Sequence, residues 1–308
     1  MTPRLTLSEE VARARKTGAP IVALESTIIT HGMPFPQNHQ TACLVEDTVR
    51  AAGATPATIA VIDGALAIGL NGDTLLALAQ RQDALKLSRA DMAFAMANGL
   101  TGAPTVAATM IGARLAGIEV FATGGIGGVH RGAEASFDIS ADLPELAQTP
   151  VTVVAAGAKA ILDLPKTLEY LETLGVPVIA YGQSAFPAFW SRQSGLDAPL
   201  SATSPLEIAR AHVMRRALAL PGGQLIANPI PLEAEIPLER ITPLIDQALA
   251  DAEGRAITGK DVTPFLLARL FELTQGASLE ANIALVRNNA ELAAQIARQL
   301  TALKETML

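Results

Sequence analysis

Short apolar runs alternate along the chain with longer stretches whose apolar residues recur at helical spacing. The apolar runs are typical of buried strands, and they lie at residues 21–24, 57–62, 120–123, 151–156, 176–180 and 224–227. The stretches between them have helical patterns, most clearly at residues 39–52, 74–80, 107–116, 161–174 and 205–218. Since strands separated by helices usually pair in parallel and are covered on both faces, the pattern predicts an α/β fold.

The last part of the chain has a different pattern. From residue 238 onward it is almost entirely helical, and it ends in an amphipathic stretch at residues 290–305. We therefore expect an α/β/α sandwich around a mainly parallel sheet, with a helical C-terminal layer. Because no repeat, low-complexity tract or linker divides the sequence, we expect residues 1–308 to form a single domain.

Composition and charge exclude several classes of protein. Of 308 residues, 50% are hydrophobic and 17% charged, so the chain is rich enough in apolar residues to build a large core and is not disordered. The net charge is −7 and no Lys/Arg-rich run occurs, so we expect no nucleic-acid partner.

The sequence also bears on location. The longest uncharged stretch, residues 92–113, contains Asn98, Gly99, Gly102 and Pro104, so it predicts helix, turn and helix rather than a membrane span. The single cysteine, Cys43, fits a reducing compartment. The N-terminal segment lacks the apolar core of a signal peptide. We expect a soluble cytoplasmic protein with no membrane partner.

Lys159 is the first candidate for chemistry. It follows the apolar run at 151–156, and no other charged residue occurs between Glu145 and Asp163. A lysine just past a buried strand, at the start of a helix, is desolvated and lies at the positive helix end, and both effects favour the neutral amine. A neutral amine can attack a carbonyl carbon. The alternative is a lysine that only extends its charge to solvent from the sheet edge.

Glu25 is the second candidate. It ends the first strand, where sites in open parallel sheets gather. A partly buried carboxyl there could have a raised pKa and act as an acid or a base. The competing interpretation is a carboxylate that caps a helix or braces a loop.

Residues 137–142 are rich in oxygen ligands, with Asp138, Ser140 and Asp142 close together in the chain. Hard oxygen ligands suit Mg²⁺ or Mn²⁺, which often take one or two carboxylates and complete their shell with water. A capping turn before a helix explains Ser140 and Asp142 equally well.

Other polar residues are less informative. Lys86 and Arg89 could hold a phosphate or could simply be solvated. His130 and Asn282 could contact a heterocycle, but as isolated polar residues they prove nothing. Trp190 is expected to pack in the core rather than to stack on a ligand.

Two glycine-rich segments resemble nucleotide-binding loops without meeting their rules. In residues 123–130, His130 stands where the dinucleotide fingerprint needs its third glycine, so the segment does not meet that rule. The interpretation that remains is a tight turn against a small anionic ligand. In 254–260, Asp261 replaces the magnesium-binding Ser or Thr of a P-loop, and a helix rather than a strand comes before it. Neither segment predicts a nucleotide site.

Taken together, the motifs resemble those of the pseudouridine-5′-phosphate glycosidase family, also called indigoidine synthase A-like. Two of them, ALESTIITHGMPFPQN at 23–38 and FATGGIGGVHRG at 121–132, are long and specific. The others follow in order over almost the whole chain, at residues 105–110, 138–143, 157–163, 227–231 and 278–286.

The resemblance implies a homotrimeric enzyme with an α/β/α sandwich that cleaves pseudouridine 5′-phosphate reversibly to uracil and ribose 5-phosphate. It implies that Lys159 is the nucleophile, forming a Schiff base with C1′ of the opened sugar, and that Glu25 is the proton donor. It makes Asp138 a ligand of Mn²⁺, largely through water, with Mg²⁺ as an alternative. The substrate-binding residues it implies are Lys86, the Val106 backbone, Ser140, Ala141 and Asp142, with His130 and Asn282 at the uracil.

The chemistry explains why such a site would be needed. Pseudouridine joins uracil to ribose through a carbon–carbon bond, so no glycosidic heteroatom is present for the two-carboxylate route of ordinary glycosidases. An iminium at C1′ provides an electron sink beside the bond that breaks. The rival functions are a class I aldolase-like sugar-phosphate lyase, a carbohydrate kinase and a non-catalytic metabolite-binding protein.

Overall fold

The computed structural model describes residues 3–257 and 262–306. Within these ranges the strands are β1 (Leu5–Leu7), β2 (Ile21–Leu24), β3 (Thr55–Ile62), β4 (Ala65–Ile68), β5 (Leu85–Leu87), β6 (Gly102–Pro104), β7 (Val120–Ala122), β8 (Thr152–Ala155), β9 (Val178–Tyr181), β10 (Leu200–Ala202) and β11 (Gln224–Ala227).

The α-helices are α1 (Glu9–Thr17), α2 (Gln37–Ala51), α3 (Gly72–Gln80), α4 (Arg89–Ala97), α5 (Val106–Leu115), α6 (Ala133–Ser136), α7 (Asp142–Gln148), α8 (Leu164–Thr173), α9 (Pro205–Ala217), α10 (Leu238–Gly254), α11 (Val262–Leu273) and α12 (Ala277–Thr306). A π-helix, η1 (Ile28–Gly32), and a 3₁₀-helix, η2 (Leu232–Ala234), complete the described elements.

All eleven of these strands form one sheet, in the order β1-β4-β3-β2-β7-β8-β11-β9-β10, with β6 paired to β3 and β5 to β6. The pairs are parallel except for β3 with β4 and β3 with β6. The central strands β7, β8 and β11 are buried along their whole length and β2 at all but its first residue, as their apolar character requires. The predicted mainly parallel sheet is confirmed.

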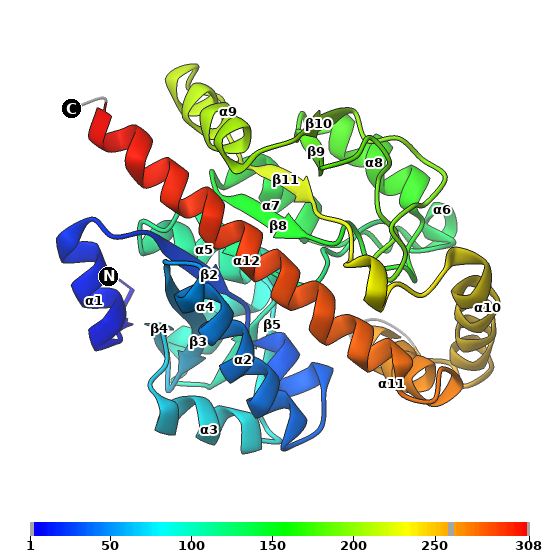
Figure 1. The fold of residues 1–308 in the computed structure, drawn as a ribbon. Coiled ribbons are helices and arrows are strands. Elements are labelled where there is room, and N and C mark those ends of the chain that lie inside the picture. Colours follow the sequence, from blue (N-terminus) through cyan, green and yellow to red (C-terminus); the bar gives the residue numbers. More distant parts are fainter. Residues whose placement is uncertain (1–2, 258–261, 307–308) are drawn as a thin grey trace.

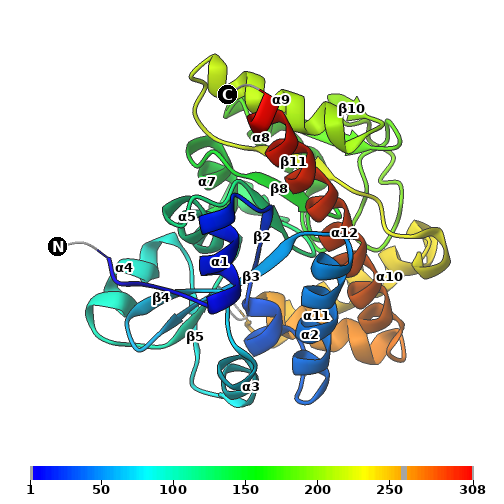
Figure 2. The same ribbon diagram turned by 60° about the vertical axis from the view of Figure 1, so that its left-hand side comes forward.

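Helices cover both faces of the sheet. The long helix α12 crosses one face beside α2 and α9 and lies along β2, β7 and β8 (Figure 1). The turned view shows α5 and α7 on the opposite face (Figure 2). The small residues of α5 allow this close approach: a Cβ on Gly112 would lie only 3.0 Å from the Ile59 side chain. The predicted α/β/α sandwich with a helical C-terminal layer is therefore confirmed.

The strand order places a topological switch point between β2 and β7. From β2 the chain continues to β3 on one side, whereas from β7 it continues to β8 on the other, although β2 and β7 are paired with each other. All four of these strands run parallel, so their carboxyl ends meet at one edge. In open α/β sheets this edge, at the switch point, is where ligands bind.

Some sequence expectations need correction. The helix expected at 161–174 begins only at Leu164, because the Asp163 side chain caps it by accepting from the Lys166 amide at 3.1 Å. Lys159 therefore lies in a loop, and the expected contribution of a helix end to its chemistry is wrong. The short strands β1, β4, β5, β6 and β10 were not anticipated.

Two other expectations concern helices. The uncharged stretch 92–113 forms parts of α4 and α5 with β6 between them, and no helix in the described ranges is long and apolar enough to cross a membrane. The P-loop-like segment follows α10, as expected, but its residues 258–261 lie outside the described residues.

Candidate active site

A pocket opens at the switch point and gathers residues from distant parts of the sequence. Glu25 directly follows β2, and Lys159 lies in the loop after β8. Lys86 comes from β5 and Asn282 from α12. These four predicted site residues are brought together, and the remaining lining residues are Thr27, Ile28, His31, Gly32, Met33, Gly124, Gly125, Phe189, Pro264, Leu267 and Val286.

Glu25 is held by two hydroxyl groups and lies within reach of the Lys159 charge. Thr123 Oγ1 donates to its Oε1 at 2.7 Å, and Thr27 Oγ1 donates to its Oε2 at 2.9 Å. Burial raises the pKa of Glu25 above its usual range, although the Lys159 charge and the two hydrogen bonds act to lower it. The site thus holds a carboxyl group suited to donating a proton, beside an amine.

The loop that carries Lys159 is fixed through its backbone. The Lys159 N–H donates to the Ile126 carbonyl at 3.1 Å, and the Ile126 N–H donates to the Gly157 carbonyl at 3.1 Å. Gly157 has φ +81°, and a Cβ there would lie 2.5 Å from the Pro187 carbonyl oxygen. Only glycine fits this turn, which aims a lysine into the pocket from an apolar loop.

Helix α12 is anchored to the same edge by one buried side chain. Asn289 Nδ2 donates to the carbonyls of Thr123 at 2.8 Å and Gly124 at 3.3 Å, and its Oδ1 accepts from Asn228 Nδ2 at 3.0 Å. This anchor places Asn282, two helical turns earlier on α12, at the wall of the pocket.

The glycine-rich segment serves packing. A Cβ on Gly125 would lie 2.7 Å from the Phe189 ring, and one on Gly127 would lie 2.2 Å from Ser140 Oγ. The close approach of neighbouring chain segments therefore explains these glycines. The expected use of this turn against an anionic ligand stays a prediction.

Two histidines lie near the cationic side of the site. Burial and the Lys86 charge lower the pKa of His31, which sequence reasoning did not single out. Burial, opposed by Asp138 and reinforced by Lys159 and Lys86, lowers the pKa of His130. His130 is not among the residues that line the pocket, but these charges place it close by.

His31 belongs to the π-helix η1, a distortion that often marks functional sites. Its Nδ1 lies 2.5 Å from Thr30 Oγ1. Its position in the same long motif as Glu25, at residues 23–38, is the sequence signal that could have identified His31 as a site residue.

The segment 140–142 and the start of α5 brace each other. Asp142 is buried, and its two carboxylate oxygens accept from the Ala107 N–H at 2.9 Å and the Gly127 N–H at 2.8 Å. Its own N–H donates to Ser140 Oγ at 3.2 Å, and Ala141 directly precedes α7. The Asp142 carboxylate thus joins α5 to the glycine-rich loop rather than capping its own helix, since α7 has no side-chain cap. The Val106 end of α5 lies beside it.

Arg89 was grouped with Lys86 as a phosphate-holding pair, and the structure separates them. The Arg89 guanidinium forms an ion pair with the buried Glu145 of α7, whereas Lys86 lines the pocket. The pairing was wrong because α4 turns Arg89 toward α7.

Asp138 has a half-exposed carboxylate, with Oδ2 3.8 Å from His130 Nδ1. No group of three or more His, Cys, Asp or Glu side chains that could hold a metal occurs in the described part of the chain. A cation at Asp138 would therefore take most of its ligands from water, which fits the habits of Mg²⁺ and Mn²⁺.

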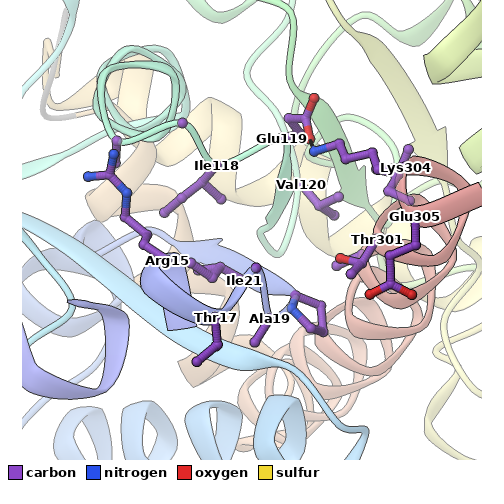
Figure 3. Close-up of a pocket in the computed structure, with 16 residues that line it drawn as sticks. Arg15, Thr17, Ala19, Ile21, Ile118, Glu119, Val120, Thr301, Lys304 and Glu305 are labelled. Atoms are coloured by element: carbon purple, nitrogen blue, oxygen red, sulfur yellow. Dashed lines mark hydrogen bonds and ion pairs between the residues drawn. The ribbon is translucent and has the colours of Figure 1, made fainter. Parts of the chain in front are cut away.

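A larger cavity, of about 470 Å³, lies at the opposite edge of the sheet (Figure 3). It is bordered by the residues preceding β2 and β7 and by the last turns of α12, and Lys304 reaches across to Glu119. None of the predicted site residues lines it. Its position, away from the carboxyl ends of the strands, separates it from Glu25 and Lys159.

The comparisons with known proteins agree with this geometry. Residues 10–299 match the family model described as Indigoidine synthase A like protein. The chain is 69% identical to the pseudouridine-5′-phosphate glycosidase of Jannaschia sp. (strain CCS1), covering 98% of this chain and all of that protein. It is 66% identical to the protein of the same name from Paracoccus denitrificans, covering 96% and 98%.

Solved structures show the same fold. The prealnumycin C-glycosynthase AlnA, solved in complex with ribulose 5-phosphate, superimposes with a TM-score of 0.91 at 37% identity, covering 99% of this chain and 100% of that one. An indigoidine synthase A-like protein from Thermotoga maritima gives a TM-score of 0.88 at 33% identity, covering 97% of each chain.

The sheet and its site thus define an α/β enzyme with an amine and a carboxyl group at the switch point. The chain belongs to the indigoidine synthase A-like family.

Proposed function

We propose that this chain cleaves the carbon–carbon glycosidic bond of pseudouridine 5′-phosphate, reversibly, to uracil and ribose 5-phosphate. The observation that carries the proposal is that one pocket holds both Lys159 and the buried Glu25, whose pKa is raised by burial. The printed name of the relatives, at 66–69% identity over nearly the whole chain, supports the choice of substrate. The lyase and kinase alternatives are not favoured by these relatives.

Glu25 and Lys159 divide the chemistry. Glu25 donates its proton to the ring oxygen as the bond between that oxygen and C1′ breaks, and the Lys159 amine forms a new bond to C1′. The new secondary ammonium at C1′ loses a proton as C5 of the uracil takes one up. The freed nitrogen lone pair then forms the C1′=N bond, while the electrons of the C1′–C5 bond return to the uracil ring. Water adds to C1′ and releases ribose 5-phosphate, which restores the amine, and the proton lost by the water returns to Glu25.

The phosphate end of the substrate needs positive charge, because the chain as a whole carries −7. Lys86 supplies one charge at the pocket wall. Strand β5 also leads toward the start of α5, since the Thr105 N–H donates to the Leu87 carbonyl at 2.8 Å. The N–H groups of that helix start, at Val106, favour an anion. We assign the phosphate to this side.

Other substrate contacts follow from position. Ser140 and Ala141 lie where the segment before α7 meets the glycine-rich loop, so they contribute through backbone and hydroxyl groups. His130 has a lowered pKa, which keeps its imidazole neutral and able to hydrogen-bond an uncharged base.

For a divalent cation, Mn²⁺ or Mg²⁺, we propose Asp138 as the protein ligand. Its exposed carboxylate and its neighbour His130 fit a water-rich site. Such a cation supplies positive charge that helps to hold the phosphate-bearing sugar.

We further propose a cytoplasmic homotrimer. Phe94 and Phe137 are large apolar residues that are 70% and 82% exposed, and burying such residues between subunits would favour assembly. The single cysteine fits a reducing compartment. Light scattering on the purified chain measures the number of subunits directly.

The test of the function is the release of uracil from pseudouridine 5′-phosphate, followed by its absorbance after chromatographic separation. The native chain is expected to release uracil and ribose 5-phosphate in equal amounts. Lys86→Ala should weaken the preference for the phosphorylated substrate over pseudouridine itself. Absence of uracil release by the native chain, with Mn²⁺ present, would contradict the proposal.

A further inference from the structure

Phe189 in the wall of the pocket packs against Trp190, and the role of Trp190 goes beyond this packing. Trp190 is the only tryptophan of the chain and is 1% exposed. Its ring meets that of Phe189 edge to face, with centroids 5.0 Å apart and an interplanar angle of 70°. Phe189 lines the pocket and lies against Gly125, where a Cβ would come within 2.7 Å of its ring. The pair is thus locked between the core and the site.

Trp190 also determines which way an amide in the pocket wall points. Its Nε1 lies 2.7 Å from Asn282 Oδ1. An indole N–H can only donate, so the amide atom facing it must be the oxygen. The Asn282 NH₂ group is therefore at the other end of the amide, and it has no hydrogen-bond partner among the described residues. It is not one of the buried unpaired groups either, which leaves it accessible in the pocket that Asn282 lines.

The surroundings of this NH₂ group suit an uncharged base. Val286 lies one turn after Asn282 on α12, and Val286, Phe189 and Leu267 give this side of the pocket an apolar surface. The positive charge of the pocket is on the other elements, at Lys86 and Lys159. A flat, neutral ring with a carbonyl oxygen fits the apolar side, and the phosphate fits the cationic one.

We propose that Trp190 sets nucleobase specificity by holding the Asn282 amide so that it presents hydrogen-bond donors to a carbonyl oxygen of the base. This inference rests on the proposed function. In a base with an amino group in place of that carbonyl, this amino group would face the Asn282 NH₂ group. Both groups are donors, so neither would be paired. Trp190 is a positioning residue, since it acts through Asn282.

The single tryptophan permits a test that replaces the N–H donor and leaves the rest of the ring system in place. Expression in a tryptophan auxotroph supplied with 3-benzothienylalanine replaces the indole N–H by sulfur at position 190 alone. The matched control is 4-fluorotryptophan, which keeps the N–H. The measurement is the ratio of kcat/KM for the uracil C-nucleotide to kcat/KM for its 2-amino and 4-amino analogues.

In the sulfur-containing enzyme this ratio is expected to fall about three- to tenfold for one analogue, because the Asn282 amide is free to turn. The fluorinated enzyme should keep the native ratio. Asn282→Asp, which offers only acceptors, should shift preference toward the same amino analogue. An unchanged ratio in the sulfur-containing enzyme, with thermal unfolding confirming a native fold, would overturn the proposal.

Binding of the free bases separates this inference from the proposed function. Calorimetry should show tighter binding of uracil than of cytosine or isocytosine to the native chain, and this difference should shrink in the sulfur-containing enzyme. A native chain that binds uracil selectively without cleaving the nucleotide would overturn the proposed reaction and keep the role of Trp190. A native chain that binds all three bases equally would overturn the role of Trp190, whatever it cleaves.

Discussion

Thr123 Oγ1 donates a hydrogen bond to Glu25 Oε1 at 2.7 Å, joining the ends of two strands that are 98 residues apart in the chain. Thr123 follows β7 and Glu25 follows β2, the pair of strands at the switch point. The position of the proposed acid is therefore set at the ends of two paired strands, next to the rigid sheet.

This bond predicts a pH effect of known sign. The Thr123 hydroxyl stabilises the carboxylate form of Glu25, so it lowers a pKa that burial raises. Thr123→Val should therefore raise the pKa of Glu25 further. Since the protonated form is the acid, activity falls as pH rises through this pKa, and the variant should keep its activity to higher pH than the native chain.

The measurement is the pH profile of kcat/KM for uracil release. Thr109→Val is the matched control, because Thr109 is buried in α5 and bonds the Pro104 carbonyl rather than Glu25. A basic limb that stays in place, or moves to lower pH, in Thr123→Val would contradict this role of Glu25.

Asn289 and Asn288 offer a matched pair on α12. Asn289→Ala removes hydrogen bonds to Thr123, Gly124 and Asn228, leaving buried polar groups unpaired, and should lower the free energy of unfolding by about 3 kcal/mol. Asn288→Ala removes a single bond to the Pro229 carbonyl and should cost about 1 kcal/mol. Urea unfolding measures both values.

Activity separates the two variants as well. Asn289→Ala should also lower kcat, since the glycine-rich loop beside Glu25 loses its anchor, whereas Asn288→Ala should not. Equal losses of stability and of kcat in the two variants would show that Asn289 has no special part in placing the site.

Glu119, in the cavity of Figure 3, predicts an acid sensitivity that is separate from catalysis. Burial alone would raise its pKa, but the His212 ring, 3.6 Å away, and the hydrogen bond and charge of Lys304 lower it to about 2. The folded state thus binds this proton less tightly than the unfolded chain does. The stability it contributes is present above the ordinary pKa of 4.5 and is lost as pH falls toward 2.

Glu119→Gln should therefore lower the free energy of unfolding at pH 7 by about 1–2 kcal/mol. The expected loss is smaller than the pKa shift alone would give, because Lys304 and Arg216, which both pair with Glu119, are partly exposed to solvent. The variant should lose less stability than the native chain between pH 4.5 and 3, as followed by urea unfolding. Parallel pH curves for the two proteins would contradict the assignment.

The proposed cation predicts a defined response to chelation. Dialysis against EDTA should abolish uracil release, and Mn²⁺ should restore it. Asp138→Asn should bind Mn²⁺ about tenfold more weakly in an electron paramagnetic resonance titration, which needs no activity, because one charged ligand is lost. Full activity of exhaustively chelated protein would show that the reaction needs no divalent cation.

The sequence predicted the architecture well because its signals are local. Central strands such as β2 and β7 are uninterrupted apolar runs, and α2 appears within two residues of its expected bounds. Glu25 and Lys159 could be singled out because each is a charged residue at the end of such a run. Their positions relative to the strands carried the prediction.

What could not be predicted depends on contacts between distant segments. Arg89 could be separated from Lys86 only once α4 was placed against Glu145. The Trp190–Asn282 bond joins residues 92 positions apart, so no local pattern marks it. His31 lies in a π-helix, for which the sequence has no periodic signal. Such pairings need the fold first.

The central claim is that Lys159 forms an imine with the sugar, and reductive trapping tests it most directly. Borohydride added during turnover, or with ribose 5-phosphate, should leave one reduced sugar phosphate on Lys159, located by peptide mass spectrometry. Lys159→Ala should lose the adduct and about a thousandfold or more of its activity, and Lys159→Arg should fail equally, because a guanidinium stays protonated. An adduct on another lysine such as Lys166, or no adduct while the native enzyme is releasing uracil, would contradict the account.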